Sequence, residues 1–463
     1  MSGAARKLGV LAAAGALVAG AAGCSSGGDS KTVEVVVGYQ SKTINTVTAG
    51  TLLRARGYFE QQLAELGRQD GRHYKVVWQD YDAGAPITAQ MLADKIDIGS
   101  MGDYPLLING SRAQAAGGPG TRLVSVTGYN LLGALNSVVV PRDSPAHTLA
   151  DLKGKKVSSS VGSASDGTLV QALAKAGVAE ADVQKQNQQP AVGASALKAH
   201  SVDALAQFVA WPAAVVFAGD GRLLYDGAAL GRPTLHGVVV RQKFGSAHPD
   251  LVRAFLRAQD AATRDLNQHP LAAAQSVAEA TGLPPEVVYL YNGPNGIATF
   301  ATALDPRLLA ALRSDVPFLA SVGVLKALDL DRFTDPSYLR DSGVTDGEPA
   351  RITGTDPVCG RPVTDPALAG ELWYQGEDAT RPAADPTCLL RAVKAGEASG
   401  AGKLRAAYVP DAATGTRWFA DQDWWVRDGD AFKPFTTEDG AAAYLAAHPS
   451  ATALTYRQAL DAA

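Results

Sequence analysis

The chain lacks a strong excess of charge of either sign. Its 42 Lys and Arg residues nearly balance 46 Asp and Glu residues, and the formal net charge is −4. Such a chain has no overall field that attracts nucleic acid or anionic lipid. It also lacks the Gly-x-Ser-x-Gly, His-Glu-x-x-His and P-loop motifs of common hydrolases, metalloproteases and nucleotide-binding enzymes. The sequence therefore predicts no nucleic-acid partner, no catalytic residue and no cofactor.

Long apolar runs are also scarce, and the clearest one stands at the N-terminus. Arg6 and Lys7 precede an uninterrupted small and apolar stretch over 8–22, and small residues then lead to Cys24. The stretch is shorter than the roughly 20 residues that a membrane-spanning helix needs. A positive start, a short apolar run and a small-residue cut site are typical of an export signal.

A cysteine directly after small residues resembles the lipobox of bacterial lipoproteins. The resemblance implies that Cys24 receives a lipid, begins the mature chain and anchors it outside the cytoplasmic membrane. Ala21 stands where the lipobox family prefers Leu, and the alternative is an ordinary signal peptide with a chance cysteine.

Cysteine is scarce, with three residues in 463. If Cys24 carries the lipid, only Cys359 and Cys388 remain, both in the last quarter of the chain. An oxidising space outside the cytoplasm favours a disulfide between them. Two buried free thiols or a metal-binding pair are the alternatives.

Apolar residues supply 46% of the chain, enough for several cores, and they fall into alternating strand and helix patterns up to about residue 345. Strands that alternate with helices indicate a parallel α/β sheet. The pattern begins again near 136, which predicts two lobes joined by two crossings, with a ligand cleft between them. A tryptophan-rich segment after a Gly- and Pro-rich linker is expected to form a small α+β domain. The predicted boundaries are a signal peptide at 1–23, a flexible linker at 24–32, lobe 1 at 33–135 and 239–345, lobe 2 at 136–238, a linker at 346–355 and a tail domain at 356–463.

Some predicted elements bear directly on the site. A helix is expected over 46–66, a short strand at 97–99, a helix opening at Asp103 and a long helical region over 306–328.

Several segments in this order resemble the solute-binding lipoproteins of ABC importers for nitrate, aliphatic sulfonates and taurine, which include THI5-like proteins. They are Val37-Gly38-Tyr39-Gln40-Ser41-Lys42, Ile98-Gly99-Ser100-Met101-Gly102-Asp103-Tyr104-Pro105, Leu149-Ala150-Asp151-Leu152-Lys153-Gly154-Lys155-Lys156-Val157 and Trp211-Pro212. The resemblance covers about 310 residues. It implies a two-lobed periplasmic-binding-protein fold of type II, a small anionic solute, an ABC permease with its ATPase as partners, and a monomeric protein.

The strand-end loops of this pattern have the chemistry of an anion site. In an open α/β sheet, ligands bind beyond the carboxyl ends of the strands, and helix N-termini there favour anions. The predicted ligand-binding residues are Gln40, Ser41, Lys42, Ser100, Met101, Gly102, Asp103, Tyr129, Ser163, Ser165 and Trp211.

Most of these side chains have a structural alternative. Lys42 can be a solvated loop residue, and Trp211 can pack inside its lobe. Asp103, Ser163 and Ser165 can cap the helices that follow them, because Asp and Ser are favoured at helix N-caps.

The tail has a resemblance of its own. Asp356-Pro357-Val358-Cys359-Gly360-Arg361, Trp424-Trp425-Val426 and the segment 437–460 are similar to NosL-type copper lipoproteins over about 105 residues. That family continues Cys-Gly into Met, whereas Arg361 stands here and the tail contains no methionine. Cu(I) prefers thiolate and thioether ligands, so no metal site is predicted.

Two further functions remain alternatives. One is copper handling through the tail. The other is a thiamin-pyrimidine-precursor binding or synthase-like protein, although the cysteine-rich motif of the synthase branch is absent between 25 and 358.

Overall fold

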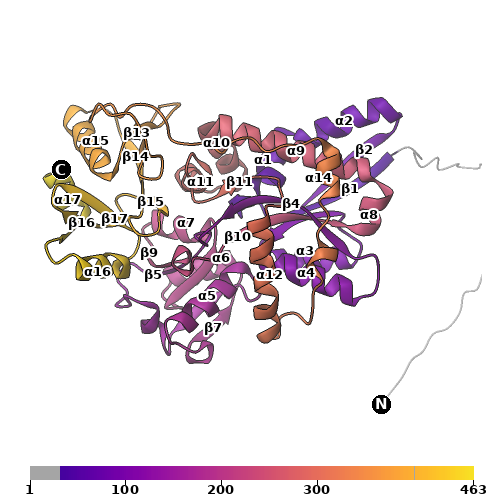
Figure 1. The fold of residues 1–463 in the computed structure, drawn as a ribbon, viewed down its shortest axis with the longest axis horizontal. Helices are drawn as coiled ribbons and strands as arrows, with labels where there is room; N and C mark the ends of the chain where they lie inside the picture. Colours follow the sequence, from indigo (N-terminus) through magenta and orange to yellow (C-terminus); the bar gives the residue numbers. More distant parts are fainter. Residues whose placement is uncertain (1–31, 401) are drawn as a thin grey trace, which may run out of the picture.

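The computed structural model describes residues 32–400 and 402–463. The predicted signal peptide, Cys24 and nearly all of the predicted linker at 24–32 lie outside the described residues. Figure 1 shows three parts: a first lobe (32–130 and 234–343), a second lobe (136–230) and a tail domain (356–463). In the part of the chain that the structure describes, no helix is both long enough and apolar enough to cross a bilayer.

The first lobe is a six-stranded sheet with helices on both faces. Its elements are β1 (Thr32–Tyr39), η1 (Ile44–Ala49), α1 (Thr51–Arg56), α2 (Tyr58–Asp70), β2 (His73–Asp80), α3 (Gly84–Leu92), β3 (Ile98–Gly102), α4 (Asp103–Ala115), β4 (Thr121–Asn130), β10 (Thr234–Arg241), α8 (Gln242–Ala247), α9 (Pro249–Gln268), α10 (Pro270–Thr281), α11 (Pro285–Asn292), β11 (Thr299–Phe300), α12 (Pro306–Ser321), α13 (Leu330–Phe333) and α14 (Ser337–Ser342).

The sheet of the first lobe is mixed, which corrects the prediction of a parallel sheet. Its strand order is β11-β4-β10-β3-β1-β2. β1 runs parallel to β2 and β3, but β10 is antiparallel to both β3 and β4. The cause is the path of the chain, because β10 returns from the second lobe instead of following a βαβ crossover.

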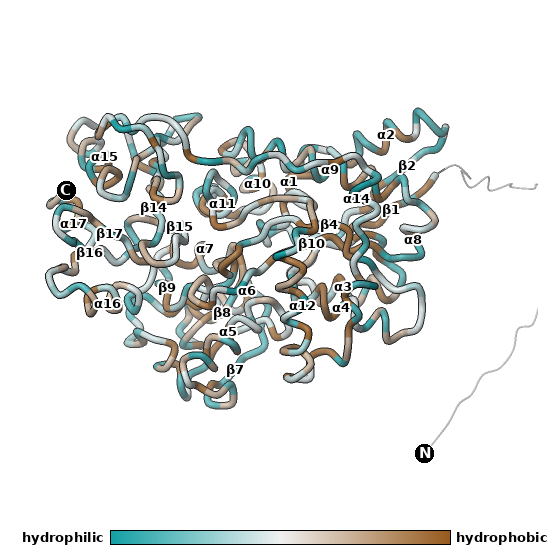
Figure 2. Tube along the Cα trace, viewed as in Figure 1, coloured by the Kyte–Doolittle hydropathy of each residue, from teal (hydrophilic) through white to brown (hydrophobic). Residues whose placement is uncertain are grey.

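Both faces of this sheet are covered, as the consecutive valines of β1 require. Val35 and Val37 are fully buried in a cluster with α2 and α9. Val36 packs into the opposite cluster, which contains α4 and α12 residues. In Figure 2 the inner strands of the lobe are more hydrophobic in colour than the helices around them.

The second lobe repeats the plan with five strands in the order β7-β6-β8-β5-β9. β6 is parallel to β7 and β8, whereas β5 is antiparallel to β8 and β9. Its elements are β5 (Asn136–Pro141), η2 (Leu149–Leu152), β6 (Lys156–Ser159), α5 (Ala164–Lys175), η3 (Glu180–Asp182), β7 (Gln184–Asn187), α6 (Pro190–Lys198), β8 (Ala204–Phe208), α7 (Trp211–Phe217), β9 (Gly221–Asp226) and η4 (Gly227–Leu230).

The two lobes are joined by crossings at 131–135 and 231–233. The second crossing precedes the predicted boundary at 238, because β10 begins at Thr234 and pairs with first-lobe strands along its whole length. The sequence pattern predicts a strand here, but it does not indicate whether β10 joins the sheet of the first or the second lobe.

The tail domain contains two small antiparallel sheets, in the orders β13-β12-β14-β15 and β17-β16-β18. A disulfide joins Cys359 to Cys388, whose Cα atoms are 6.0 Å apart. The tail's elements are β12 (Gly370–Tyr374), β13 (Arg381–Ala383), α15 (Pro386–Ser399), β14 (Leu404–Pro410), β15 (Arg417–Phe419), β16 (Trp424–Asp428), β17 (Ala431–Phe435), α16 (Glu438–Ala447), β18 (Thr452–Leu454) and α17 (Tyr456–Ala462).

Two predicted helices are interrupted. The region 46–66 forms η1, α1 and α2, because Gly57 adopts φ +66°, a left-handed conformation that ends one helix and starts the next. The long helical region ends at Ser321, and α13 forms separately at Leu330.

Candidate ligand site between the lobes

The candidate site lies where four strands end and the chain turns toward the other lobe. β1 and β3 are parallel neighbours in the first lobe, and β6 and β8 are parallel neighbours in the second. The carboxyl ends of parallel neighbours share one edge of a sheet, so the segments that follow them come together. Those segments hold most of the predicted ligand-binding residues.

Lys42 and Trp211 meet across the lobes. Lys42 is an exposed side chain in the loop after β1, and Trp211 is the first residue of α7 in the second lobe. The Lys42 Nζ lies 5.9 Å from the centroid of the Trp211 ring, within the range of a cation–π contact. Lys42 forms no ion pair with any residue that the structure describes. A cation without a carboxylate partner therefore faces the second lobe.

Gln40 and Ser100 form the inner wall next to this lysine. Gln40 is buried, and its Nε2 donates to the backbone oxygen of Ser100 over 3.2 Å. The buried Ser100 hydroxyl has no protein partner among the described residues. The backbone of Ser41 is held in place, since its N–H donates to Asp80 and its carbonyl accepts from Thr51.

Ser163 and Ser165 stand at the start of α5. Their hydroxyl oxygens are 2.9 Å apart and both side chains are buried. Ser163 also caps the helix, because its Oγ accepts from the backbone N–H of Asp166. The Asp166 carboxylate is paired with Lys185 at 2.8 Å, so its negative charge is compensated at this helix end. Ser163 therefore caps α5, and ligand contact by either serine stays a prediction.

Met101 and Gly102 do not lie in a loop, contrary to the prediction. β3 runs over Ile98–Gly102, longer than the predicted strand at 97–99. Met101 is fully buried in the apolar cluster of the first lobe, and a Cβ at Gly102 would lie 2.7 Å from the His236 Nε2. Met101 and Gly102 are therefore part of the sheet. Pairing with β10 extends β3 to Gly102, beyond position 99, where the sequence pattern predicts the strand to end.

Asp103 opens α4 and is fixed by backbone donors. Its carboxylate accepts from the N–H groups of Tyr104 (2.8 Å) and Leu235 (3.3 Å). Burial raises the pKa of Asp103 to about 7. Burial also lowers the pKa of nearby His236 to about 3, so this imidazole is neutral near pH 7. His236 therefore supplies no positive charge near pH 7.

A second contact between the lobes lies beside Asp103. The hydroxyl of Tyr104 accepts from Gln171 Nε2 of the second lobe over 2.6 Å. The Tyr104 ring occupies the space where a side chain on Gly167 would stand. The sequence prediction missed these three residues, because nothing local indicates which helix faces which.

A cavity adjoins this contact and is lined by both lobes and both crossings. It includes Asp103, Gln171, Arg232 and Asp315. Burial, and after it the charge of Asp103, raise the pKa of Asp315 to about 8 against the opposing charge of Arg232. The carboxyl of Asp315 is therefore largely protonated near pH 7.

Tyr129 lies on β4, next to Leu235 of β10, whose backbone N–H donates to Asp103. Tyr129 is half-buried, opposite Thr299 of β11, and packs with the cluster on the α12 side of the sheet. Burial raises its pKa. A role for Tyr129 in ligand binding stays a prediction.

The cysteine pair of the tail does not fit a copper ion. Asp356, Cys359 and Cys388 place one ligand atom each within 4.8 Å of one another. Both sulfurs, however, belong to the disulfide, and the Asp356 carboxylate accepts from three backbone N–H groups. Cu(I) requires thiolate or thioether sulfur, which this arrangement lacks.

Comparisons with known proteins match the two-lobed part of the chain. The NMT1/THI5-like family model matches residues 109–273. An Escherichia coli K12 protein named for aliphatic-sulfonate binding is 30% identical over 258 residues, which cover 55% of this chain and 74% of that protein. The chain belongs to the family of this sulfonate-binding protein, called the SsuA-like family below.

Two further relatives support the family. The taurine-binding periplasmic protein of E. coli K12 is 25% identical over 225 residues, covering 48% of this chain and 66% of that protein. The alkanesulfonate-binding protein SsuA from Xanthomonas axonopodis pv. citri, solved with bound MOPS, superposes with a TM-score of 0.55 at 25% identity. That match covers 65% of this chain and 98% of SsuA. These relatives are solute-binding proteins, and the fold of the two lobes is the type II periplasmic-binding-protein fold.

Proposed function

We propose that this SsuA-like protein is the solute-binding component of an ABC importer and captures a small organic sulfonate between its lobes. The observation that carries the proposal is the Lys42 ammonium, unpaired among the described residues and facing Trp211 of the opposite lobe. A solute held there contacts both lobes, so its binding favours their closure.

The surrounding groups suit a sulfonate. The N-terminus of α5 presents N–H groups that have no acceptor within the helix, and such ends favour anions. The hydroxyls of Ser100, Ser163 and Ser165 can donate to the three oxygens of a sulfonate group. The Trp211 ring offers an apolar face for the carbon part of the solute. Protonation of Asp315 near pH 7 reduces repulsion between the nearby cavity and an anion.

Solute delivery completes the proposal. The protein passes its solute to a permease and its ATPase, as the resemblance to ABC-importer receptors implies. A lipid on Cys24 would hold the receptor at the outer side of the cell membrane, with the Ser- and Gly-rich segment after it as a flexible tether. No catalytic step is part of this function.

Calorimetry of the full chain against taurine, 1-butanesulfonate and nitrate tests the proposal. We expect both sulfonates to bind in preference to nitrate, because nitrate lacks a carbon part for Trp211. Lys42→Met should weaken sulfonate binding about tenfold or more, because it removes a charged donor.

Lys75→Met is the matched control. Lys75 is a first-lobe lysine on β2 whose side chain is 60% exposed, and it pairs with Glu34 away from the other lobe. A folded protein that binds neither sulfonate would contradict the proposed solute class. Equal weakening by both lysine variants would contradict the role of Lys42.

A further inference from the structure

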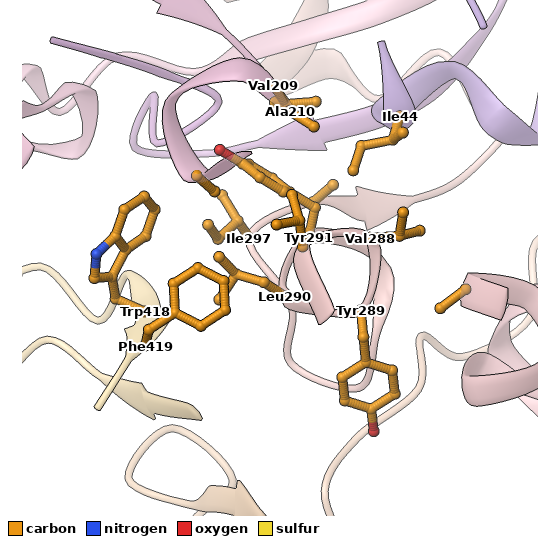
Figure 3. Close-up of a cluster of buried hydrophobic side chains, with 14 of the residues drawn as sticks. Ile44, Val209, Ala210, Val288, Tyr289, Leu290, Tyr291, Ile297, Trp418 and Phe419 are labelled. Atoms are coloured by element: carbon orange, nitrogen blue, oxygen red, sulfur yellow. The ribbon is translucent and has the colours of Figure 1, made fainter. Parts of the chain in front are cut away.

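The tail domain contacts both lobes, although the chain connects it only to the first. In Figure 1 the tail lies beside α11 of the first lobe and α7 of the second. Figure 3 shows one apolar cluster that contains Ile44 and Leu290 of the first lobe, Val209 of the second, and Trp418 and Phe419 of the tail. The three parts therefore share a core.

The attachment to the first lobe is buried, and an ion pair of the tail lies beside it. The Tyr289 hydroxyl on α11 donates to Glu371 of β12 over 3.1 Å, and Glu371 pairs with Arg417 of β15 at 2.8 Å. The side chains of this pair are only 6% and 3% exposed. The Tyr289 ring packs against Trp373 and Tyr408 with centroids 5.7 and 5.5 Å away. Separation would expose the packed rings of Tyr289, Trp373 and Tyr408 to water, so this side holds firmly.

A second set of bonds strengthens the same attachment. Arg405 Nε donates to Glu286 of α11 over 2.7 Å, and the Tyr408 hydroxyl donates to the Glu286 backbone oxygen over 3.0 Å. Arg417 also donates to the Pro294 backbone oxygen over 2.8 Å. The tail and α11 thus form a unit that moves with the first lobe.

The attachment to the second lobe is smaller. Asp226, at the end of β9, accepts from the hydroxyls of Thr416 (2.6 Å) and Thr414 (3.1 Å). Phe217, at the end of α7, packs against Phe419 with ring centroids 5.3 Å apart. Phe217 remains 37% exposed, so this contact buries less than the Tyr289 cluster does.

Two exposed contacts extend the same interface. The Arg142 Nη2 donates to Gln422 over 2.5 Å, and His147 Nδ1 lies 2.6 Å from a Glu438 carboxylate oxygen. The His147 side chain is 58% exposed, and exposed pairs of this kind contribute little individually. The second lobe is therefore held by several separable contacts.

We infer that the tail is a latch that biases the two lobes toward the arrangement in which they contact each other. Because the lobes are joined only at 131–135 and 231–233, rotation of the second lobe away from the first moves Phe217, Asp226 and Arg142 away from a tail that stays on the first lobe. Opening of the lobes must break these contacts, so the contacts stabilise the closed arrangement relative to the open one. The inference rests on the proposed function, since the latch acts on the affinity of the solute site.

The test compares two double variants of the full chain, each removing one charged and one apolar exposed side chain from the second lobe. Arg142→Ala/Phe217→Ala removes latch contacts. Val192→Ala/Lys198→Ala is the control, at an exposed valine and a lysine that pairs with Asp220 of its own lobe. Both carry Cys24→Ser and nitroxide labels at Arg68→Cys and Lys153→Cys, whose native side chains are 68% and 70% exposed on opposite lobes.

Pulsed electron spin resonance without solute reports the distance between the labels. We expect the latch variant to show an additional, longer distance, while the control keeps the distribution of the parent chain. Taurine or butanesulfonate should bind the latch variant about fivefold or more weakly, because closure then lacks these contacts. An unchanged distance distribution in the latch variant would overturn the inference. The distances decide this even if no sulfonate binds, so the latch and the proposed solute are tested separately.

Discussion

Gly167→Ala should obstruct the closure of the lobes without altering the fold of either one. Gly167 lies in α5 of the second lobe, against the ring of Tyr104 in α4 of the first. A Cβ at this position would lie 1.7, 2.3 and 2.6 Å from three atoms of Tyr104, whereas ordinary contacts begin at 3.4 Å. The shortest approach must therefore lengthen by about 1.7 Å, the difference between 3.4 and 1.7 Å.

The tyrosine has little freedom to provide that space. Its ring lies 6.2 Å from Phe318, its hydroxyl accepts from Gln171, and its side chain is 5% exposed. Overpacking of a filled contact costs about 1–3 kcal/mol. Because this cost falls on the closed state, sulfonate affinity should decrease by about five- to 150-fold. Calorimetry with butanesulfonate measures the loss, and far-ultraviolet circular dichroism verifies that the secondary structure is retained.

A double-mutant cycle separates the clash from other effects. Tyr104→Ala alone removes packing and the bond to Gln171, so it should weaken binding by itself. Tyr104→Ala/Gly167→Ala should bind more tightly than the sum of the single effects predicts, because the added methyl group then has space. Wild-type affinity in Gly167→Ala would refute the reasoning, since the solute-bound lobes would then not approach as closely as they do in this structure.

Two further predictions concern the tail and its interface. Burial raises the pKa of Asp226 to about 6, so its contribution to stability is fully present below about pH 4 and is lost as pH rises through 6. Urea unfolding from pH 4 to 7 should therefore show Asp226→Asn gaining up to about 3 kcal/mol over the parent chain by pH 6, and parallel curves would contradict this. Cys359→Ser/Cys388→Ser opens a loop with a sequence separation of 29 residues and should lower the free energy of unfolding by about 3–4 kcal/mol. Tail tryptophan fluorescence in urea measures that loss, and an unchanged midpoint would contradict it.

The sequence pattern was most informative where local composition and burial agree. The alternation of strands and helices predicts an α/β sheet, and the structure has helices packed on both faces of the sheet that contains β1. It failed where partners distant in the chain decide the structure. β3 extends to Gly102 because β10 pairs with it, and the same pairing makes the sheet mixed and moves the second crossing.

The candidate site shows the same division. The loop after β1 and the cap of α5 could be recognised as anion-binding chemistry from Lys42, Ser163 and Ser165, because strand ends and helix starts have local signatures. Met101 was misplaced, since its side chain faces a core that no local pattern describes. Gly167 and Tyr104 were missed, because their contact depends on how one lobe meets the other.

The sequence by itself determined a two-lobed α/β fold with an appended domain, since strand and helix periodicity is a local property, and its strand-end motifs carried the resemblance to the family. Only the tertiary structure decided that Lys42 faces Trp211 and that the tail bonds to both lobes. Those contacts join residues distant in the chain, such as Tyr289 with Glu371, 82 positions apart, and Asp226 with Thr416, 190 positions apart. They depend on the orientation of whole lobes, which is set by packing over large interfaces and not by neighbouring residues.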